Sequence, residues 1–405
     1  MKVISICIMM LHGTLITAYN AIVTIPIADL VGSPLPIQHH STVRAYQELP
    51  VCGATYQPFV ACPRLHQALF NQQVEVIQER GDQVCVRIPN VFYVTHSNTH
   101  HNQFWMARSA LTPITTVQNQ KINLATFPRP IDAATKTVPE KDIVTLIEPF
   151  HDIKTGLMFS AGTRFVITQT KPSAHTFAVY RYDPARNNVG TMHIPKKSCT
   201  VIAPDCTSRE RVRHYVTLAR QWAIHTPDAI PYGWGCCSYI ERSQPNNFTE
   251  IIKQKEGQSY SYYTRPDCSS KTKSGLDCSG LICLAAQCCG IPCFLKNSTT
   301  IAHCLHPVTS HEAIIEGDII WIPKHVMIVG SLKHNTLIEA RHYEQGYGYV
   351  QEIPLSAVFK GITTYQELYA ACVHKKPLVR LDSEGTPRET IRECKILQIM
   401  SVWNT

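Results

Sequence analysis

The chain has 405 residues, a length that suits two or three domains rather than one. Apolar residues make up 44% of it and charged residues 17%, so packed cores are expected and a disordered chain is excluded. The formal net charge of +8 favours polyanionic surroundings. The sequence holds no block of lysine and arginine and no basic-aromatic stripe, which argues against a nucleic-acid partner.

Residues 1–21 read "MKVISICIMMLHGTLITAYNA", in which a lysine precedes an apolar run and small residues follow it. This pattern resembles a secretory signal peptide and favours a periplasmic or secreted protein. His12 and Gly13 interrupt the run, so a buried first strand is the alternative reading, and a cytoplasmic location stays open. No later run is long enough to span a bilayer stably.

Residues 22–112 predict an all-β unit. Within them, "VEVIQERGDQVCVRI" alternates apolar and polar residues around an Arg-Gly-Asp turn, which indicates a hairpin with one apolar face. Residues 113–140 carry Pro, Thr, Asn and Gln without periodicity and predict a linker. Residues 141–205 repeat the β pattern, with "TRFVITQT" and "TFAVYRYD" on either side of a Lys-Pro-Ser turn. Two small β-barrels in tandem fit these two segments.

The pattern changes to helical spacing near residue 208. "SRERVRHYVTLARQWAI" predicts an amphipathic helix, with Ser208 as a partial N-cap and the glutamate of a capping box displaced to Glu210. "DCSGLICLAAQCCGI" predicts a second helix that begins near Cys278. Four strands are then expected, at 319–322, 325–330, 336–340 and 349–353. The more charged extension at 376–405 contains one further short strand pattern that the sequence does not place.

The 17 cysteines are an odd number without regular spacing, which argues against a fully paired disulfide scaffold. We therefore expect most of them, including Cys283, Cys288 and Cys289, to be small packing residues. Cys278 differs because it opens a helix, where exposed N–H groups and the helix dipole favour the thiolate that nucleophilic catalysis needs. A structural cysteine is the alternative. His325 opens a strand and can supply the imidazole that accepts and returns a proton.

The segments "PYGWG", "DCSGLI", "EGDIIWI", "HVMIVG" and "LIEA" stand in the order found in NlpC-type cysteine peptidases of bacterial peptidoglycan. Residues 206–375 resemble this family, and the upstream β segments resemble bacterial SH3 domains. The likeness is strongest to the γ-D-glutamyl-diamino acid endopeptidases. The resemblance implies an α+β chain in which two SH3-like barrels precede a papain-like catalytic domain.

The resemblance also implies catalytic roles. Cys278 matches the nucleophile and His325 the general base, while relatives mostly carry a histidine as the third member of the triad. Here that position is Glu339, whose carboxylate could orient an imidazole, and His342 is the rival candidate. The alternative for Glu339 is a salt bridge with Arg341 or a nearby lysine.

Four further residues match substrate-binding positions of the family. Tyr232 matches a tyrosine that lines the active site, and Asp277 matches an acidic residue that holds the free amino terminus of the stem peptide. Ser279 belongs to the same subsite, and Ser298 corresponds loosely to the pocket wall. The family has no counterpart of the insertion at 236–276, which is either a lid or a surface loop.

The expected reaction is hydrolysis of a stem-peptide amide, between γ-D-Glu and the diamino acid, through an acyl-enzyme. The alternatives are an inert wall-binding protein and another thiol amidase or acyltransferase on the same fold. Expected partners are stem peptides or muropeptides, and the chain is expected to act as a monomer. Neither a cofactor nor a metal is predicted, because the cysteine spacings around Cys236 and Cys237 match no zinc motif.

Overall fold

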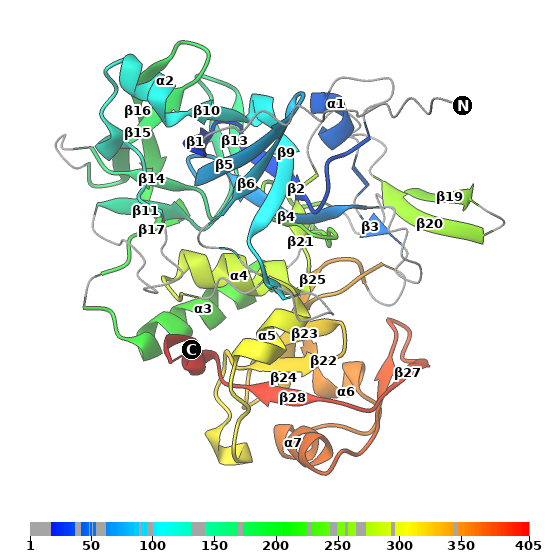
Figure 1. The fold of residues 1–405 in the computed structure, drawn as a ribbon. Helices are drawn as coiled ribbons and strands as arrows, with labels where there is room; N and C mark the ends of the chain where they lie inside the picture. Colours follow the sequence, from blue (N-terminus) through cyan, green and yellow to red (C-terminus); the bar gives the residue numbers. More distant parts are fainter. Residues whose placement is uncertain are drawn as a thin grey trace, which may run out of the picture.

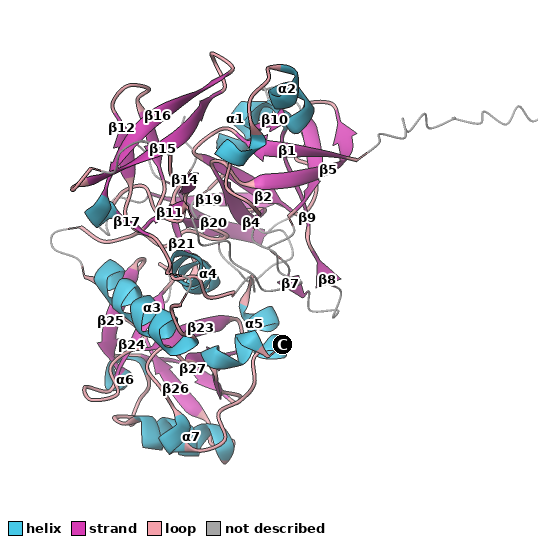
Figure 2. Cartoon of the chain, turned by 90° about the vertical axis from the view of Figure 1, so that its left-hand side faces the viewer, coloured by secondary structure: helices cyan, strands magenta, loops and turns pink. Residues whose placement is uncertain are grey.

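The computed structural model describes residues 18–36, 42–47, 49–50, 52–53, 62–88, 91, 93–94, 100–130, 142–168, 173–203, 205–224, 228–243, 249–255, 258–264, 273–292, 296–343 and 347–404. Figure 1 shows β-strands of the first half of the chain above and a sheet from the last third below. Helices α3 (Ser208–Ala223) and α4 (Cys278–Cys288) lie between them, as the turned view in Figure 2 also shows.

The first β unit is a seven-stranded sheet in the order β10-β1-β5-β6-β9-β2-β4. The predicted hairpin is present as β5 and β6, with Gly81 at a φ of 58° in the turn, where glycine avoids the strain of a side chain. The strands are β1 (Tyr19–Val23), β2 (Ile27–Val31), β4 (Arg64–Leu69), β5 (Gln73–Arg80), β6 (Gln83–Arg87), β9 (Gln103–Ala107) and β10 (Leu111–Pro113). Shorter elements are α1 (Thr42–Gln47), β3 (Cys52–Gly53), β7 (Tyr93–Val94), β8 (His100–His101) and η1 (Arg108–Ala110).

The start of the chain bears on the predicted leader. Residues 1–17 lie outside the described residues, whereas β1 begins at Tyr19, inside the 1–21 segment. Val23 and Ala21 of β1 are buried in the core of the first β unit. The sheet therefore uses the last three residues of the segment whose pattern resembles a signal peptide.

The segment expected to be a linker is folded where the structure describes it. Residues 114–119 form α2 (Ile114–Asn119) and residues 124–126 form η2 (Leu124–Thr126), while 131–140 lie outside the described residues. Val117 and Phe127 are buried in the same core as Phe70 of the first β unit and Val144 of the second. Only a few apolar side chains anchor the segment, which is why its sequence lacks periodicity.

The second β unit consists of three small antiparallel sheets: β14-β11-β17, β12-β13 and β15-β16. The two runs on either side of the Lys-Pro-Ser segment are joined by the Ile167–Val179 bridge, but their main partners are other strands. β14 pairs with β11, and β15 pairs with β16 over eight residues. Asp183 and Asn187, with φ of 53°, make the turn between them. The strands are β11 (Ile143–Leu146), β12 (Phe150–Asp152), β13 (Leu157–Phe159), β14 (Arg164–Val166), β15 (Thr176–Asp183), β16 (Asn188–Pro195) and β17 (Cys199–Thr200). The short helix η3 (Lys196–Ser198) connects β16 to β17. In neither β unit do the described pairings close a barrel.

The third unit is built on a five-stranded antiparallel sheet in the order β25-β24-β23-β22-β28. Its strands are β22 (Ile319–Ile322), β23 (His325–Val329), β24 (Thr336–Ala340), β25 (Val350–Pro354) and β28 (Lys395–Leu397), and the first four lie where the sequence predicts them. The other elements are α5 (Ser298–Cys304), η5 (His311–Ala313), α6 (Leu355–Val358), α7 (Tyr365–Val373), β26 (Leu378–Leu381), β27 (Pro387–Ile391) and η6 (Ile399–Trp403).

Both faces of this sheet are covered. Successive side chains of a strand alternate between faces, so Val326 and Ile328 of β23 pack in one core with α3 and α4. Met327 and Val329 pack in a second core with α6 and α7. The C-terminal extension, which the sequence did not place, closes the sheet edge through β28 and is tied to α7 by the Cys372–Cys394 disulfide.

Helix α3 begins one residue earlier than its partial signature indicates. Thr207, rather than Ser208, is the N-cap: its hydroxyl accepts from the Glu210 N–H at 3.3 Å, and the Glu210 carboxylate accepts from the Thr207 N–H at 2.8 Å. This is a full capping box. All six apolar positions that predict the helix are buried, namely Val212, Tyr215, Val216, Leu218, Ala219 and Trp222.

The first β unit holds the loop that precedes α4. The amide of Gln67, on β4, donates to the Lys273 carbonyl at 2.6 Å and accepts from the Cys237 N–H at 3.0 Å. Arg64 donates to the Trp234 carbonyl at 3.1 Å. The insertion at 236–276 forms β18 (Cys237–Ser238), β19 (Thr249–Lys255), β20 (Gln258–Thr264) and β21 (Gly275–Leu276). Strand β20 pairs with β3 of the N-terminal part of the chain. Residues 244–248, 256–257 and 265–272 lie outside the described residues.

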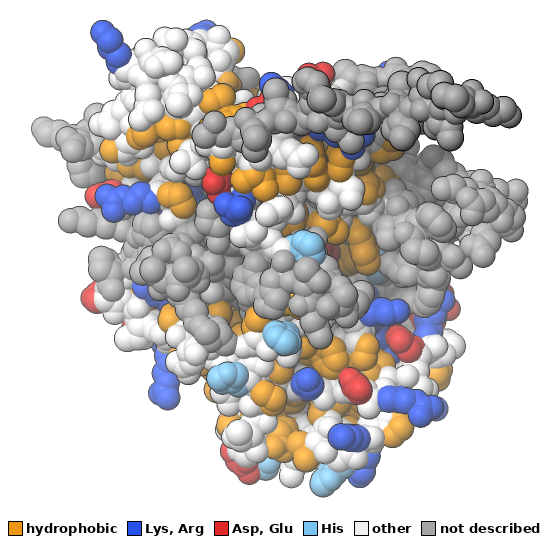
Figure 3. All heavy atoms as spheres, viewed as in Figure 1, with side chains coloured by type: hydrophobic (Ala, Val, Ile, Leu, Met, Phe, Trp, Pro, Cys, Tyr) orange, Lys and Arg blue, Asp and Glu red, His pale blue; other side chains and the backbone are white. Residues whose placement is uncertain are grey.

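Figure 3 shows lysine, arginine, aspartate and glutamate side chains interspersed over the lower part of one face. Among the described residues, no helix is long and apolar enough to cross a membrane.

Candidate active site

Cys278 is the first residue of α4 and is half-buried. The Asp277 side chain caps the helix by accepting from the Gly280 N–H at 2.6 Å. Gly280 is required by close packing, since a Cβ at this position would lie 2.1 Å from the Cys236 carbonyl oxygen. The backbone N–H groups of Val326 and Ser279 lie close enough to the Cys278 sulfur to lower the pKa of its thiol by hydrogen bonding. The sulfur therefore lies at the head of β23, beside the residue that follows His325.

The electrostatics of Cys278 differ from the sequence-based expectation of a favoured thiolate. Burial, followed by the charge of the Asp277 carboxylate, raises the pKa of the Cys278 thiol to about 12 against the opposing effects of the two backbone N–H groups and the Lys296 ammonium. The partial loss of solvation outweighs the effect of the helix terminus, because burial penalises the charged form of the thiol. At neutral pH the thiol is protonated, and its proton must be removed during the reaction.

His325 and Glu339 lie on the same face of adjacent strands. The Nε2 atom of His325 is 2.9 Å from Oε2 of Glu339, and the Glu339 side chain is fully buried. Burial, followed by the charge of Arg380, lowers the pKa of His325 to about 4 despite the hydrogen bond to Glu339. The imidazole is therefore neutral at neutral pH. With the Nε2 proton donated to the carboxylate, Nδ1 carries the free lone pair of a base.

Glu339 stays ionised although it is buried. Burial alone would raise its pKa, but the His325 hydrogen bond and the charges of Arg380 and Arg341 lower it to about 2. Arg380 Nη2 lies 3.0 Å from Oε2, and Arg341 Nη1 lies 3.9 Å from Oε1. The salt bridge with Arg341 that was the alternative for Glu339 therefore exists alongside the contact to His325. The rival residue His342 packs edge-on against Tyr232, with ring centroids 5.4 Å apart.

Asp277 is occupied by a partner from its own chain. Lys296 Nζ lies 2.7 Å and 2.9 Å from the two carboxylate oxygens, and both side chains are largely buried. The Ser279 hydroxyl donates to Asp277 at 2.9 Å, so these two residues of the expected amine subsite bond to each other. The carboxylate that the resemblance assigns to a substrate amine already holds an ammonium group.

The remaining expected substrate residues are buried. Tyr232 is 5% exposed, and its backbone N–H donates to the Gly348 carbonyl at 2.8 Å. Ser298 is 8% exposed and opens α5, directly after Asn297, whose side chain caps that helix. Cys283, Cys288 and Cys289 are buried in the core around α4, as expected for packing residues.

Sequence reasoning named Arg341 as a possible partner of Glu339, but it missed Lys296 and Arg380 as parts of this site. Arg380 lies 41 residues beyond Glu339 and belongs to no recognised motif. A signal was nevertheless present, since "PLVRLDS" places an arginine among apolar residues in a strand, a position that is rarely charged unless it is paired. Among the described residues, no group of three His, Cys, Asp or Glu side chains could hold a metal ion.

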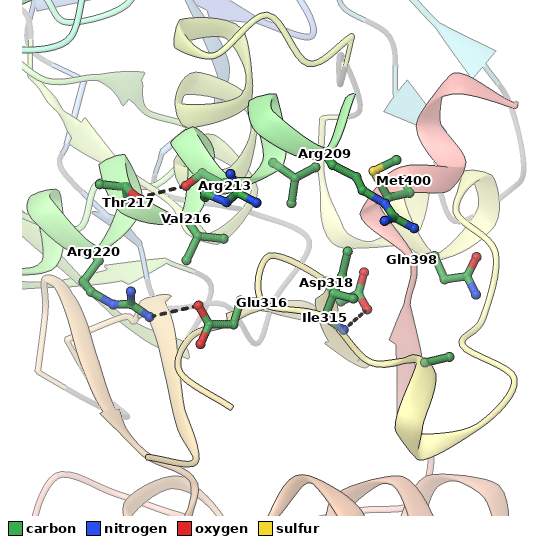
Figure 4. Close-up of a pocket in the computed structure, with 12 residues that line it drawn as sticks. Arg209, Arg213, Val216, Thr217, Arg220, Ile315, Glu316, Asp318, Gln398 and Met400 are labelled. Carbon is green, nitrogen blue, oxygen red and sulfur yellow. Dashed lines mark hydrogen bonds and ion pairs between the residues drawn. The ribbon is translucent and has the colours of Figure 1, made fainter. Parts of the chain in front are cut away.

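A pocket of about 670 Å³ lies away from this constellation (Figure 4). It is enclosed by α3, the turn around Glu316 and the C-terminal residues Gln398 and Met400. None of the predicted site residues lines it, and Arg220 in its wall is paired with Glu352 at 3.0 Å. The size of this pocket therefore says nothing about the chemistry at Cys278.

No protein-family model and no curated protein matches the chain. Its fold is of the NlpC type. The solved structure of an NlpC/P60 family protein from Bacillus cereus ATCC 10987 matches it with a TM-score of 0.51 at 16% identity, covering 86% of this chain and 96% of that chain. Such an identity shows a shared fold. NlpC2 from Trichomonas vaginalis matches with a TM-score of 0.29 at 11% identity, covering 93% of this chain and 98% of that chain. NlpC1 from the same organism matches with a TM-score of 0.28 at 12% identity, covering 93% of each chain.

Proposed function

We propose that the chain is a cysteine endopeptidase that hydrolyses peptidoglycan stem peptides at the bond between γ-D-Glu and the diamino acid. The observation that carries the proposal is the 2.9 Å contact between His325 Nε2 and the buried Glu339 carboxylate. It prepares a base at the strand head where the Cys278 sulfur lies. The NlpC-type fold supports the peptidase part of the proposal, whereas the choice of bond rests on the motif resemblance alone.

The proposed reaction starts from a neutral thiol and a neutral imidazole. The Cys278 proton moves to Nδ1 of His325 as the sulfur attacks the substrate carbonyl carbon, and Glu339 stabilises the resulting imidazolium. The imidazolium gives its proton to the leaving amine, and an acyl-enzyme thioester remains. His325 then takes a proton from water, the resulting hydroxide attacks the thioester, and Cys278 regains a proton as the acid leaves.

The proposal extends to the other parts of the chain. The two β units would be SH3-like modules that restrict access to the site, and the chain would act as a monomer on stem peptides or muropeptides. A periplasmic or secreted location would follow if the leader is a signal peptide. Support for a restricting role comes from Arg64 and Gln67, which hold the loop before α4 from the first β unit.

The test is cleavage of L-Ala-γ-D-Glu-diaminopimelate, with products identified by mass spectrometry. The wild type should release diaminopimelate, and Cys278→Ala should lose at least about 10³-fold in kcat/KM. Cys283→Ala is the matched control, because it removes a thiol from the same helix at a packing position, and it should keep activity.

Equal inactivity of the wild type and Cys278→Ala on a panel of stem peptides would contradict the peptidase assignment and favour a wall-binding protein. Release of a different product from mixed muropeptides would keep the thiol mechanism and reassign the bond. Activity retained in Cys278→Ala would remove the assigned nucleophile.

A further inference from the structure

The Glu339 carboxylate is held by side chains from three other strands and from the residue that follows its own strand. His325 of β23 and Arg380 of β26 contact the same oxygen, Oε2, at 2.9 Å and 3.0 Å. Gln351 of β25 donates to Oε1 at 3.4 Å, and Arg341, just beyond β24, approaches Oε1 at 3.9 Å. Contacts on both oxygens prevent the carboxylate from rotating about its terminal bond. The direction from Oε2 to His325 is therefore fixed.

Arg380 itself is fixed by the C-terminal extension. It is 5% exposed and lies in the middle of β26, whose neighbour Val379 accepts from the Lys360 N–H at 2.8 Å. The Arg341 guanidinium also reaches this strand, donating to the Leu381 carbonyl. The Cys372–Cys394 disulfide ties the segment after β27 to α7. The C-terminal extension therefore contributes a fixed side chain, that of Arg380, to the site.

The charge of this cluster is unbalanced. Glu339 is one anion between two buried guanidinium groups, and among the described residues Asp382 and Tyr347 also act on Arg341. Among the described residues, Nε of Arg380 and Nε of Arg341 are buried without a hydrogen-bond partner. A purely structural pair would gain from satisfying these donors. The arrangement instead directs both cations at the carboxylate that orients His325.

We propose that Arg380 is a positioning residue of the active site: it fixes Glu339 so that Oε2 accepts the Nε2 proton of His325 and leaves Nδ1 free to take the Cys278 proton. The catalytic consequence rests on the proposed function. The orientation and charge of His325 do not depend on the proposed function, because they can be measured without a substrate. A second consequence follows from charge, since Arg380 opposes protonation of the imidazole in the resting protein.

The test compares Arg380→Gln and Arg380→Lys with Arg388→Gln, an exposed arginine on the neighbouring strand β27. The His325 pKa is measured by NMR titration of the histidine rings, assigned with His325→Gln, and the pH profile of kcat/KM is measured in parallel. In Arg380→Gln the His325 pKa and the acid limb should both rise by about one pH unit or more, because a nearby cation is lost. At neutral pH kcat should fall at least tenfold. Arg380→Lys keeps the charge, so its acid limb should stay near that of the wild type, and Arg388→Gln should change neither quantity.

A folded Arg380→Gln with an unchanged His325 titration would overturn the proposal. If Arg380→Gln does not fold, the test is the Nε2–H proton resonance of His325 in Arg380→Lys. A shift of this resonance from its wild-type position supports the positioning role of Arg380, and an identical resonance overturns that role. If the wild type cleaves no stem peptide while the His325 pKa still changes in the Arg380 variants, the stem-peptide function is overturned and the positioning role of Arg380 remains.

Discussion

The reactivity of Cys278 distinguishes a buried neutral thiol from a preformed thiolate. Its pKa is raised to about 12 from an ordinary 9.0, a difference of three units. At pH 7.4 this reduces the thiolate fraction about 10³-fold, and alkylation slows in proportion because the thiolate is the reacting form. Cys206 and Cys304 are half-buried like Cys278, so they are matched to it in access, and we expect Cys278 to react with iodoacetamide far more slowly than either of them.

The perturbation that checks the cause is Asp277→Asn. Its carboxylate is the second contribution to the raised pKa, so its removal should speed alkylation of Cys278 by about tenfold. Rates are followed for each cysteine by mass spectrometry of digests between pH 6 and 10.5. Asp205→Asn, an exposed change, is the control and should leave the Cys278 rate unaltered. A Cys278 rate that equals that of Cys206 at pH 7.4, or that levels off below pH 9, would refute the reasoning.

Three other expectations concern stability. The folded pKa of His325, about 4, lies below its ordinary 6.5, so the unfolded state binds the proton first and stability falls as the pH drops through this window. In urea unfolding, the free energy of unfolding of the wild type should fall by about 3 kcal/mol between pH 7 and pH 4, and His325→Gln should lack this fall. Parallel plots of unfolding free energy against pH for the two proteins would contradict the expectation. Replacing Cys372 and Cys394 by serine should cost about 3 kcal/mol, because the disulfide spans 22 residues; a midpoint unaffected by reductant in the wild type would argue otherwise. Lys296→Met should cost about 3–5 kcal/mol by leaving Asp277 buried and unpaired, whereas adding Asp277→Asn should recover part of the loss; an additive double variant would count against the ion pair.

Several parts of the site could be predicted because their signals are local. The helix over residues 208–223 follows from six apolar residues on one face, and all six are buried. The start of α4 at Cys278 follows from an aspartate cap and a glycine that permits close packing. The strand positions of His325 and Glu339 also follow from the sequence, whereas the face that they share follows from the register of β23 with β24 in the structure.

Other features depended on groups that are distant along the chain. The seven-stranded order of the first β unit, in place of a small closed barrel, is a matter of pairing between strands that no local pattern encodes. The shift of the Cys278 pKa had the opposite sign to the expectation. The helix terminus is visible in the sequence, whereas the loss of water around the sulfur is a property of the packed protein.

The sequence by itself determined the secondary structure around the site and the identity of the nucleophile and base candidates, since periodicity, capping and turn chemistry act over a few residues. Only the tertiary structure decided that Arg380 meets Glu339 and that Lys296 meets Asp277. Such ion pairs form wherever folding brings opposite charges together in a dry interior, where an unpaired charge is costly, and their partners can lie anywhere along the chain.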